Sequence, residues 1–114
     1  MKRISTHVLD MNRGKPAQHV PVRLERQLQS GEWTLIASSR TDADGRCAQL
    51  LPDTTVLESG NYKLAFDTSS YQSDNHVETL FPVVEITFRV RDGESQFHLP
   101  LLLSPHGYTT YRGS

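Results

Sequence analysis

The amino-acid sequence predicts one all-β domain, an antiparallel β-sandwich of about eight strands with one short helix. The first observation is that apolar and polar residues alternate in several short segments, most regularly at Val84, Ile86, Phe88 and Val90. Such alternation is typical of strands with one buried and one solvated face. The second is that Gly, Asp, Asn, Ser and Pro cluster between these segments, where turns are expected. The third is that only residues 67–75 have a composition suited to a helix.

The first half of the chain supplies four expected strands, at residues 4–10, 20–25, 33–39 and 47–51. Turns are expected between them at 12–16, 30–31 and 41–46. The Asp44-Gly45 pair makes the last of these turns sharp. Pro52 ends the fourth strand, because proline has no N–H to donate to a β-ladder.

The second half supplies the remaining elements. Tyr62, Leu64 and Phe66 indicate one face of a fifth strand, and the polar segment 67–75 indicates a helix of two turns at most. Three further strands are expected at 84–91, 96–103 and 108–112. We found no internal repeat or linker, so residues 1–114 are expected to form a single domain.

Composition excludes several classes of protein. The 114 residues carry a formal net charge of −1, which favours neither nucleic acid nor an anionic membrane as a partner. No apolar segment approaches the roughly 20 residues needed to cross a bilayer. The start of the chain is too short and polar for a signal peptide, so we expect a cytoplasmic protein. Cys47 is the single cysteine, which excludes an intrachain disulfide and is expected to be a small buried thiol.

The alternating pattern also orients two histidines. In strand 96–103 the core face carries Phe97 and Leu99, so His98 points away from the core, and by the same argument so does His7. The alternative for each histidine is that it is a partly exposed polar residue with no catalytic or binding role. Arg46 follows a sharp turn, where its ordinary role is a solvated residue paired with an aspartate. The histidines do not have ligand spacing, and no cysteine or acidic residue clusters with them, so we expect no metal site.

Four sequence motifs resemble the transthyretin-related proteins: Ser5–Asp10, Gly14–Ala17, Thr41–Arg46 and His98–Pro105. The terminal segment Tyr111-Arg112-Gly113-Ser114 resembles the branch of this family that is 5-hydroxyisourate hydrolase, and the hormone-carrying transthyretins lack it. The resemblance runs from about residue 4 to the last residue, in register and without a large gap.

The resemblance implies a transthyretin-like (prealbumin-like) sandwich that assembles as a homotetramer, a dimer of dimers. It also implies a cyclic amide hydrolase of urate (purine) catabolism, which opens 5-hydroxyisourate to 2-oxo-4-hydroxy-4-carboxy-5-ureidoimidazoline without a cofactor. The catalytic residues that it implies are His7, Arg46, His98 and Ser114. The substrate-binding residues that it implies are His7, Arg46, Tyr111, Arg112 and Gly113.

These residue types suit the reaction. Opening a ring amide with water needs a base for the water and positive charge for the carbonyl oxygen. We expect His7 and His98 to share the proton transfers, in either order, and Arg46 to polarise the carbonyl. Because both histidines point outward, we expect a second copy of the chain to cover the site. A transthyretin-like protein that binds a small ligand without catalysis is the first alternative, and a sandwich without any site is the second.

Overall fold

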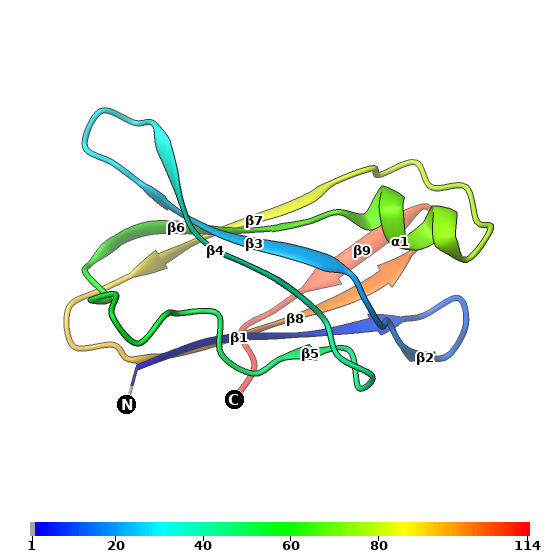
Figure 1. Cartoon of the computed structure of the whole chain (residues 1–114), viewed down its shortest axis with the longest axis horizontal. Helices are drawn as coiled ribbons and strands as arrows, with labels where there is room; N and C mark the ends of the chain where they lie inside the picture. The colour runs from blue at the N-terminus through cyan, green and yellow to red at the C-terminus, as the bar shows by residue number, and fades with distance from the viewer. Residues whose placement is uncertain (1) are drawn as a thin grey trace.

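The computed structural model describes residues 2–114, which form two β-sheets packed face to face (Figure 1). The strands of the first sheet, called sheet A, are β1 (Arg3–Asp10), β2 (Lys15–Pro16), β5 (Arg46–Cys47), β8 (Gln96–Ser104) and β9 (Gly107–Thr110). The strands of the second, called sheet B, are β3 (Pro21–Gln27), β4 (Trp33–Arg40), β6 (Gly60–Phe66) and β7 (Val84–Val90). The strand order is β2-β1-β8-β9 in sheet A, where β5 also pairs with β1, and β4-β3-β6-β7 in sheet B. The expected sandwich is confirmed.

One strand pair departs from the expected antiparallel arrangement. β1 and β8 run parallel in the centre of sheet A, and every other pair is antiparallel. In this register Ser5 lies opposite His98, and His7 lies opposite Pro100. The pairing joins residues more than ninety positions apart, so alternation within each strand could not reveal it.

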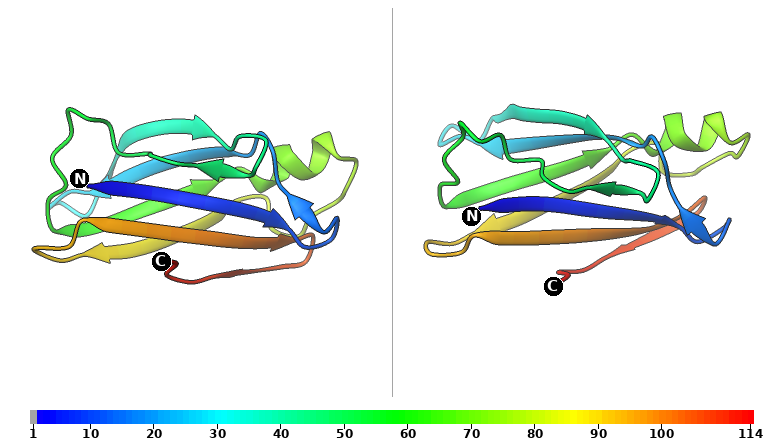
Figure 2. Two further views of the ribbon diagram at one scale, coloured as in Figure 1. Left: turned by 90° about the horizontal axis from the view of Figure 1, so that it is seen from below. Right: turned by 60° about the horizontal axis from the view of Figure 1, so that its bottom comes forward.

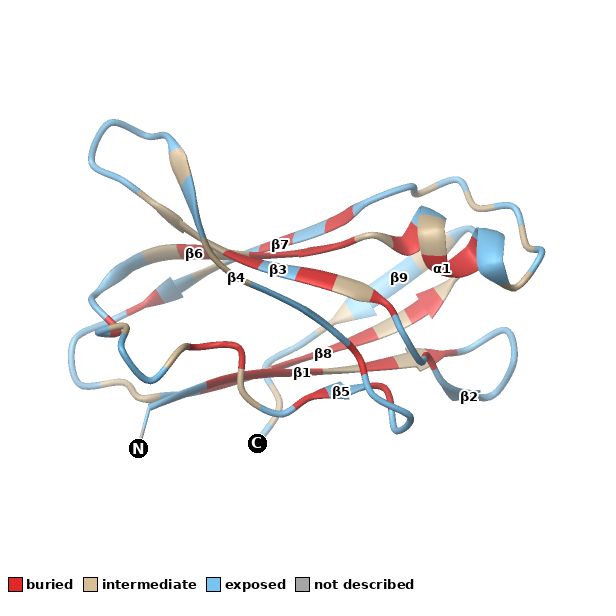
Figure 3. Ribbon diagram, in the orientation of Figure 1, coloured by how far each residue is buried: buried red, intermediate tan, exposed pale blue. Residues whose placement is uncertain are grey.

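The core lies between the facing sides of the two sheets, where the buried segments face each other (Figure 3). The alternating apolar residues of each strand fill it, and Ile4, Val8 and Leu101 are completely buried. The rings of Tyr62 and Phe88 lie 6.0 Å apart, and those of Phe88 and Phe97 lie 5.6 Å apart. These aromatic contacts join the two sheets, because Phe97 belongs to β8 and the other two belong to sheet B.

Two expected strands are shorter than the alternation predicts. β5 ends at Cys47, because the side chain of Gln49 accepts the Ile4 N–H at 3.1 Å and so takes the place of a backbone partner. The last strand ends at Thr110, although residues 108–112 were expected in it. There Pro100 has no N–H to donate, and its carbonyl accepts from the Thr110 hydroxyl at 2.8 Å.

The only helix found in residues 2–114, α1 (Thr68–Asp74), lies within the predicted segment 67–75. The Asp67 carboxylate caps its first turn by accepting from the Ser70 N–H at 2.9 Å. The Tyr71 hydroxyl donates to the buried Asp10 carboxylate at 2.7 Å, which joins the helix to the end of β1. Burial, together with this bond, raises the pKa of Tyr71 to about 12. Within residues 2–114 no helix is long and apolar enough to span a membrane.

Candidate functional site

The outer face of sheet A brings together the three side chains on which the sequence analysis depends. Arg46 of β5 lies opposite His7 of β1, and on the other side of β1 the parallel pairing places Ser5 opposite His98 of β8. His7 and His98 are therefore diagonal neighbours on one face. Their outward direction is confirmed, since both are partly exposed while the residues on either side of them along the strand are buried.

The turn before β5 fixes where Arg46 stands. One carboxylate oxygen of Asp42 accepts the backbone N–H groups of both Asp44 and Arg46 at 2.9 Å. These bonds, that of Arg46 first, hold the pKa of Asp42 below its usual value. Gly45 has a φ of +76°, and a Cβ there would collide with the carbonyl oxygen of Val8, so the turn needs glycine. The turn therefore places Arg46 beside His7 through backbone hydrogen bonds alone, and the Arg46 guanidinium takes no part in them.

The His7 ring has one nitrogen held by the protein. Its Nε2 donates to the carbonyl oxygen of Asp44 at 2.8 Å. A carbonyl oxygen only accepts, so this nitrogen carries a proton. When the ring is neutral, Nδ1 is therefore its unprotonated nitrogen.

The His98 ring is held at its other nitrogen. Its Nδ1 lies 2.9 Å from the hydroxyl oxygen of Ser5, which is buried. Burial first, and then the positive charges of Arg46 and His7, lower the pKa of His98 below its ordinary value of 6.5. The imidazole is therefore mainly neutral at pH 7, which suits proton transfer.

The C-terminal segment folds back over His98. After β9 the chain turns along β8 (Figure 2), and the Gly113 N–H donates to the carbonyl oxygen of His98 at 2.7 Å. A Cβ at Gly113 would lie 2.6 Å from the His98 Cδ2 and 3.2 Å from Pro100. Any larger residue would therefore force the segment or the imidazole to shift where the two pack together.

A pocket of about 350 Å³ opens at this place on the surface. The residues lining it are Arg3, Ser5, Thr6, Arg46, Cys47, Ala48, Gln96, Phe97, His98, Gly113 and Ser114. It therefore gathers Arg46, His98, Gly113 and Ser114 of the expected site. Sequence reasoning missed Arg3 and Ser5. Both could have been found, because residues 3, 5 and 7 of a strand point to the same side, which is the outward side of β1 here.

Three expected residues lie outside the pocket lining. His7 turns its Nε2 to the loop carbonyl of Asp44, and Tyr111 is 55% exposed. Arg112 points along the sheet, where its guanidinium pairs with Glu94 at 3.0 Å and lies over the Phe97 ring at 4.8 Å. The charge of Arg112 thus anchors the segment, and the bond to it lowers the pKa of Glu94.

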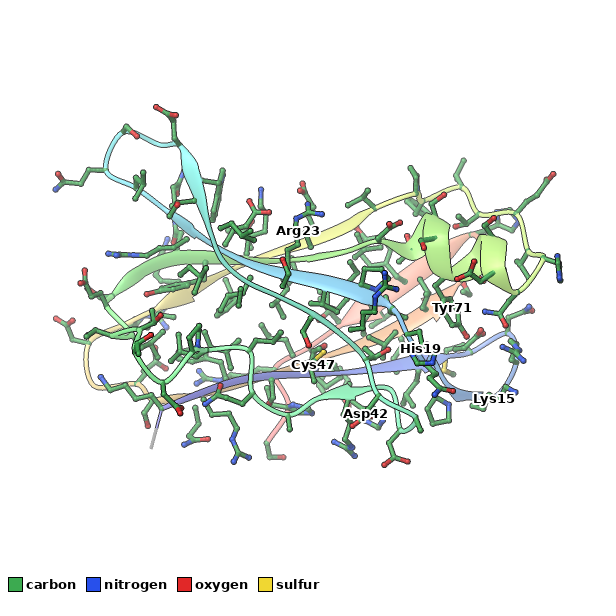
Figure 4. The ribbon with its side chains drawn as sticks, viewed as in Figure 1. Lys15, His19, Arg23, Asp42, Cys47 and Tyr71 are labelled. Atoms are coloured by element: carbon green, nitrogen blue, oxygen red, sulfur yellow. The ribbon has the colours of Figure 1, made fainter. Side chains whose placement is uncertain are left out.

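The remaining candidates keep their ordinary roles. Cys47 lies on the inner side of sheet A (Figure 4), and burial raises the pKa of its thiol, which confirms the expected buried thiol. Across residues 2–114 no three His, Cys, Asp or Glu side chains group closely enough to hold a metal ion.

The pocket thus combines the His98 imidazole, the Arg46 guanidinium and the folded-back C-terminal segment, with His7 beside it. Residues 4–113 match the model of the HIUase/Transthyretin family. The chain belongs to this family. A 5-hydroxyisourate hydrolase of Mus musculus is 44% identical over 112 residues, with 97% of this chain and 94% of the relative covered.

Two solved members of the HIUase/Transthyretin family share the fold. The 5-hydroxyisourate hydrolase of Klebsiella pneumoniae has a TM-score of 0.85 and 38% identity, with all of both chains covered. Sea bream transthyretin, solved in complex with thyroxine, has a TM-score of 0.90 and 31% identity, with 97% of this chain and 94% of that one covered. The same fold thus occurs in a 5-hydroxyisourate hydrolase and in a transthyretin solved with thyroxine bound.

Proposed function

We propose that this chain is a hydrolase that opens the ring amide of 5-hydroxyisourate with water, as a step in urate degradation. The observation that carries the proposal is the joining of Arg46, His98 and residues 113–114 in one pocket beside His7. The mouse relative, 44% identical across nearly the full length of both chains, is named for this activity. The reaction needs a base, an acid and a cation, and the pocket together with His7 beside it offers groups for all three.

Arg46 binds the substrate carbonyl in this proposal. Its guanidinium makes no hydrogen bond or ion pair with residues 2–114, so it is available to grip two acceptor atoms of a urate-like ring. As water attacks, negative charge develops on the carbonyl oxygen, and a cation held in place stabilises it.

The two histidines carry the protons. Each ring has one nitrogen bonded to the protein, which leaves Nδ1 of His7 and Nε2 of His98 for water and substrate. Since Nε2 of His7 carries a proton, its Nδ1 is suited to take a proton from the attacking water. His98 then orients the substrate or returns a proton to the leaving nitrogen.

The C-terminal segment completes the site in this proposal. Gly113 and Ser114 line the pocket, and Arg112 anchors them through Glu94. Ser114 orients a neighbouring side chain by hydrogen bonding. Tyr111, which is exposed on a single chain, hydrogen-bonds the substrate once a second copy approaches.

We also propose a cytoplasmic homotetramer, a dimer of dimers, with the sites at subunit interfaces. Arg46, Tyr111 and Ser114 are exposed on one chain, and electrostatic catalysis weakens in bulk water. A second copy placed on the outer face of sheet A would shelter them. β7 and β9 end their sheets with one edge unpaired, which leaves them available for pairing with another copy.

A second candidate is a carrier of a small ligand, favoured by the likeness to sea bream transthyretin solved with thyroxine. Two arginines and a histidine line the pocket here, which suits a polar ring better than an apolar ligand.

A single assay separates the candidates. 5-Hydroxyisourate is generated with urate oxidase, and its ultraviolet decay is followed with and without the protein. The decay should accelerate, and His7→Ala and His98→Ala should each lower kcat by about 10²–10⁴-fold without lowering the melting temperature. Unchanged decay would refute the hydrolase. A fully active monomer in light scattering would refute the interfacial site.

A further inference from the structure

We infer that Ser5 is a positioning residue that fixes the orientation and tautomer of His98, so that Nε2 of the ring carries a proton into the pocket. This inference rests on the proposed function for its kinetic consequences, although the tautomer itself can be measured without any activity. Ser5 is not one of the residues that sequence reasoning selected.

The contact between Ser5 and His98 is set by the backbone. The two residues lie directly opposite each other in the parallel β1·β8 pair, and both side chains point to the outer face of sheet A. The Ser5 hydroxyl oxygen lies 2.9 Å from Nδ1 of His98, within hydrogen-bonding distance. Register, rather than loop conformation, therefore places the hydroxyl at this ring nitrogen.

The direction of this hydrogen bond follows from burial. Ser5 is only 8% exposed, and its hydroxyl has Nδ1 of His98 as its one partner in the part of the chain that the structure describes. A buried hydroxyl proton needs an acceptor. A neutral imidazole accepts at one nitrogen only, so the hydroxyl donates to Nδ1 and the ring proton lies on Nε2.

Gly113 holds the opposite edge of the same ring. Its Cα has no room for a Cβ, which would lie 2.6 Å from the His98 Cδ2. The imidazole is thus clamped between the serine hydroxyl and the C-terminal segment, and Nε2 is the nitrogen left for a ligand in the pocket. His98 then acts through an Nε2–H donor, and the unprotonated Nδ1 of His7 is the base.

The experiment combines Ser5→Ala and Ser5→Thr with ¹⁵N NMR of the histidine rings in the full chain. The wild type should show a protonated Nε2 and an unprotonated Nδ1 at His98, and Ser5→Ala should give a mixture of tautomers. With 5-hydroxyisourate as substrate, Ser5→Ala should lower kcat about tenfold and change KM less. Ser5→Thr, which restores a hydroxyl, should recover both the tautomer and most of kcat.

Two controls separate positioning from stability. Thr68→Val removes another buried hydroxyl, one that donates to the Phe81 carbonyl beside α1, and should lower the melting temperature but leave kcat unchanged. Ser5→Ala added to His98→Ala should cause no further loss, because the serine acts only through that ring.

Either of two results would overturn the inference: a wild type with a protonated Nδ1 at His98, or a Ser5→Ala protein with unchanged tautomer and kcat. If the wild type does not hydrolyse 5-hydroxyisourate, the proposed function fails, and the NMR result still decides whether Ser5 fixes the His98 ring.

Discussion

The two outer faces of the sandwich carry charge in opposite ways. Across β3, β6 and β7 of sheet B four charges are paired: Arg23 pairs with Glu25 at 3.3 Å, and Lys63 pairs with Glu25 at 3.8 Å and with Glu85 at 3.5 Å. The Lys63 ammonium also lies 4.4 Å from the centre of the Trp33 ring. We call these five residues the sheet B ladder. Figure 4 shows Arg23 pointing away from sheet A.

On the outer face of sheet A the arginine that lines the pocket beside His98 remains available. Arg46 has no carboxylate partner among residues 2–114, although Asp42 and Asp44 are close to it in sequence. The Asp42 carboxylate accepts two backbone N–H groups, and the Arg46 charge helps to lower its pKa without forming an ion pair with it. Alternation produces a polar outer face on both sheets. Arg46 differs from the paired charges of sheet B because it has no ion pair among residues 2–114 and lines a pocket together with His98.

The largest effect is expected from a matched pair of arginine substitutions. Arg46→Gln should lower kcat/KM for 5-hydroxyisourate about 10²–10³-fold, because it removes the cation at the developing oxyanion. Arg23→Gln removes an exposed arginine of the sheet B ladder and should leave kcat/KM unchanged. Steady-state kinetics on both variants tests this prediction. Equal losses of kcat/KM in the two variants would show that the arginines of the two outer faces do not differ in their role.

The same Arg46→Gln protein gives an independent signal in NMR titration. Burial is the main cause that lowers the pKa of His98, and the charge of Arg46 is the second. Removing that cation stabilises the protonated imidazole, so the pKa should rise toward 6.5. A pKa that stays the same or falls would mean that the Arg46 charge does not act on the ring.

A smaller loss is expected from Gly113→Ala. The added Cβ would meet the His98 ring edge and Pro100, so the C-terminal segment or the ring must shift. A displacement near 1 Å in a catalytic group costs up to about 10²-fold in rate, and kcat should fall by about ten- to a hundredfold.

Gly31→Ala is the matched control, since a Cβ there meets nothing within 4 Å and the strain of its φ of +93° stays in the hairpin. It should lower stability slightly and leave kcat unchanged. Full activity in Gly113→Ala would show that the segment does not clamp His98.

Much of the fold was predictable, because alternation and turn residues depend on local sequence. The segments around β3, β7 and α1 were found close to their actual bounds, and so was the outward direction of His7 and His98. The prediction was wrong in expecting every strand pair to be antiparallel, since β1 and β8 are parallel. It was also wrong at two strand ends, where a side chain replaces a backbone partner: Gln49 at the end of β5, and Thr110 at the end of β9.

The site was only partly predictable, because its contacts join distant segments. The family resemblance selected Arg46 and Gly113, which the structure brings to His98, but the Ser5–His98 contact depends on a parallel register that periodicity does not encode. The ion pair between Arg112 and Glu94 likewise joins the segment after β9 to the loop between β7 and β8, and no local pattern in the sequence predicts that these two segments meet.

The smallest effect tests the sheet B ladder. Lys63→Gln removes two ion pairs and the contact with Trp33, and because the lysine side chain is only 13% exposed its charge is poorly screened. The free energy of unfolding should fall by about 0.5–1.5 kcal/mol, measured by urea denaturation at one protein concentration. The difference from wild type should shrink in high salt, because screening weakens the pairs that remain in the wild type.

The kcat of Lys63→Gln should equal that of the wild type, since the ladder lies on the other sheet from the pocket. A variant that keeps its stability but loses activity would show that sheet B takes part in the site, and the unpaired charges of sheet A would then no longer mark it.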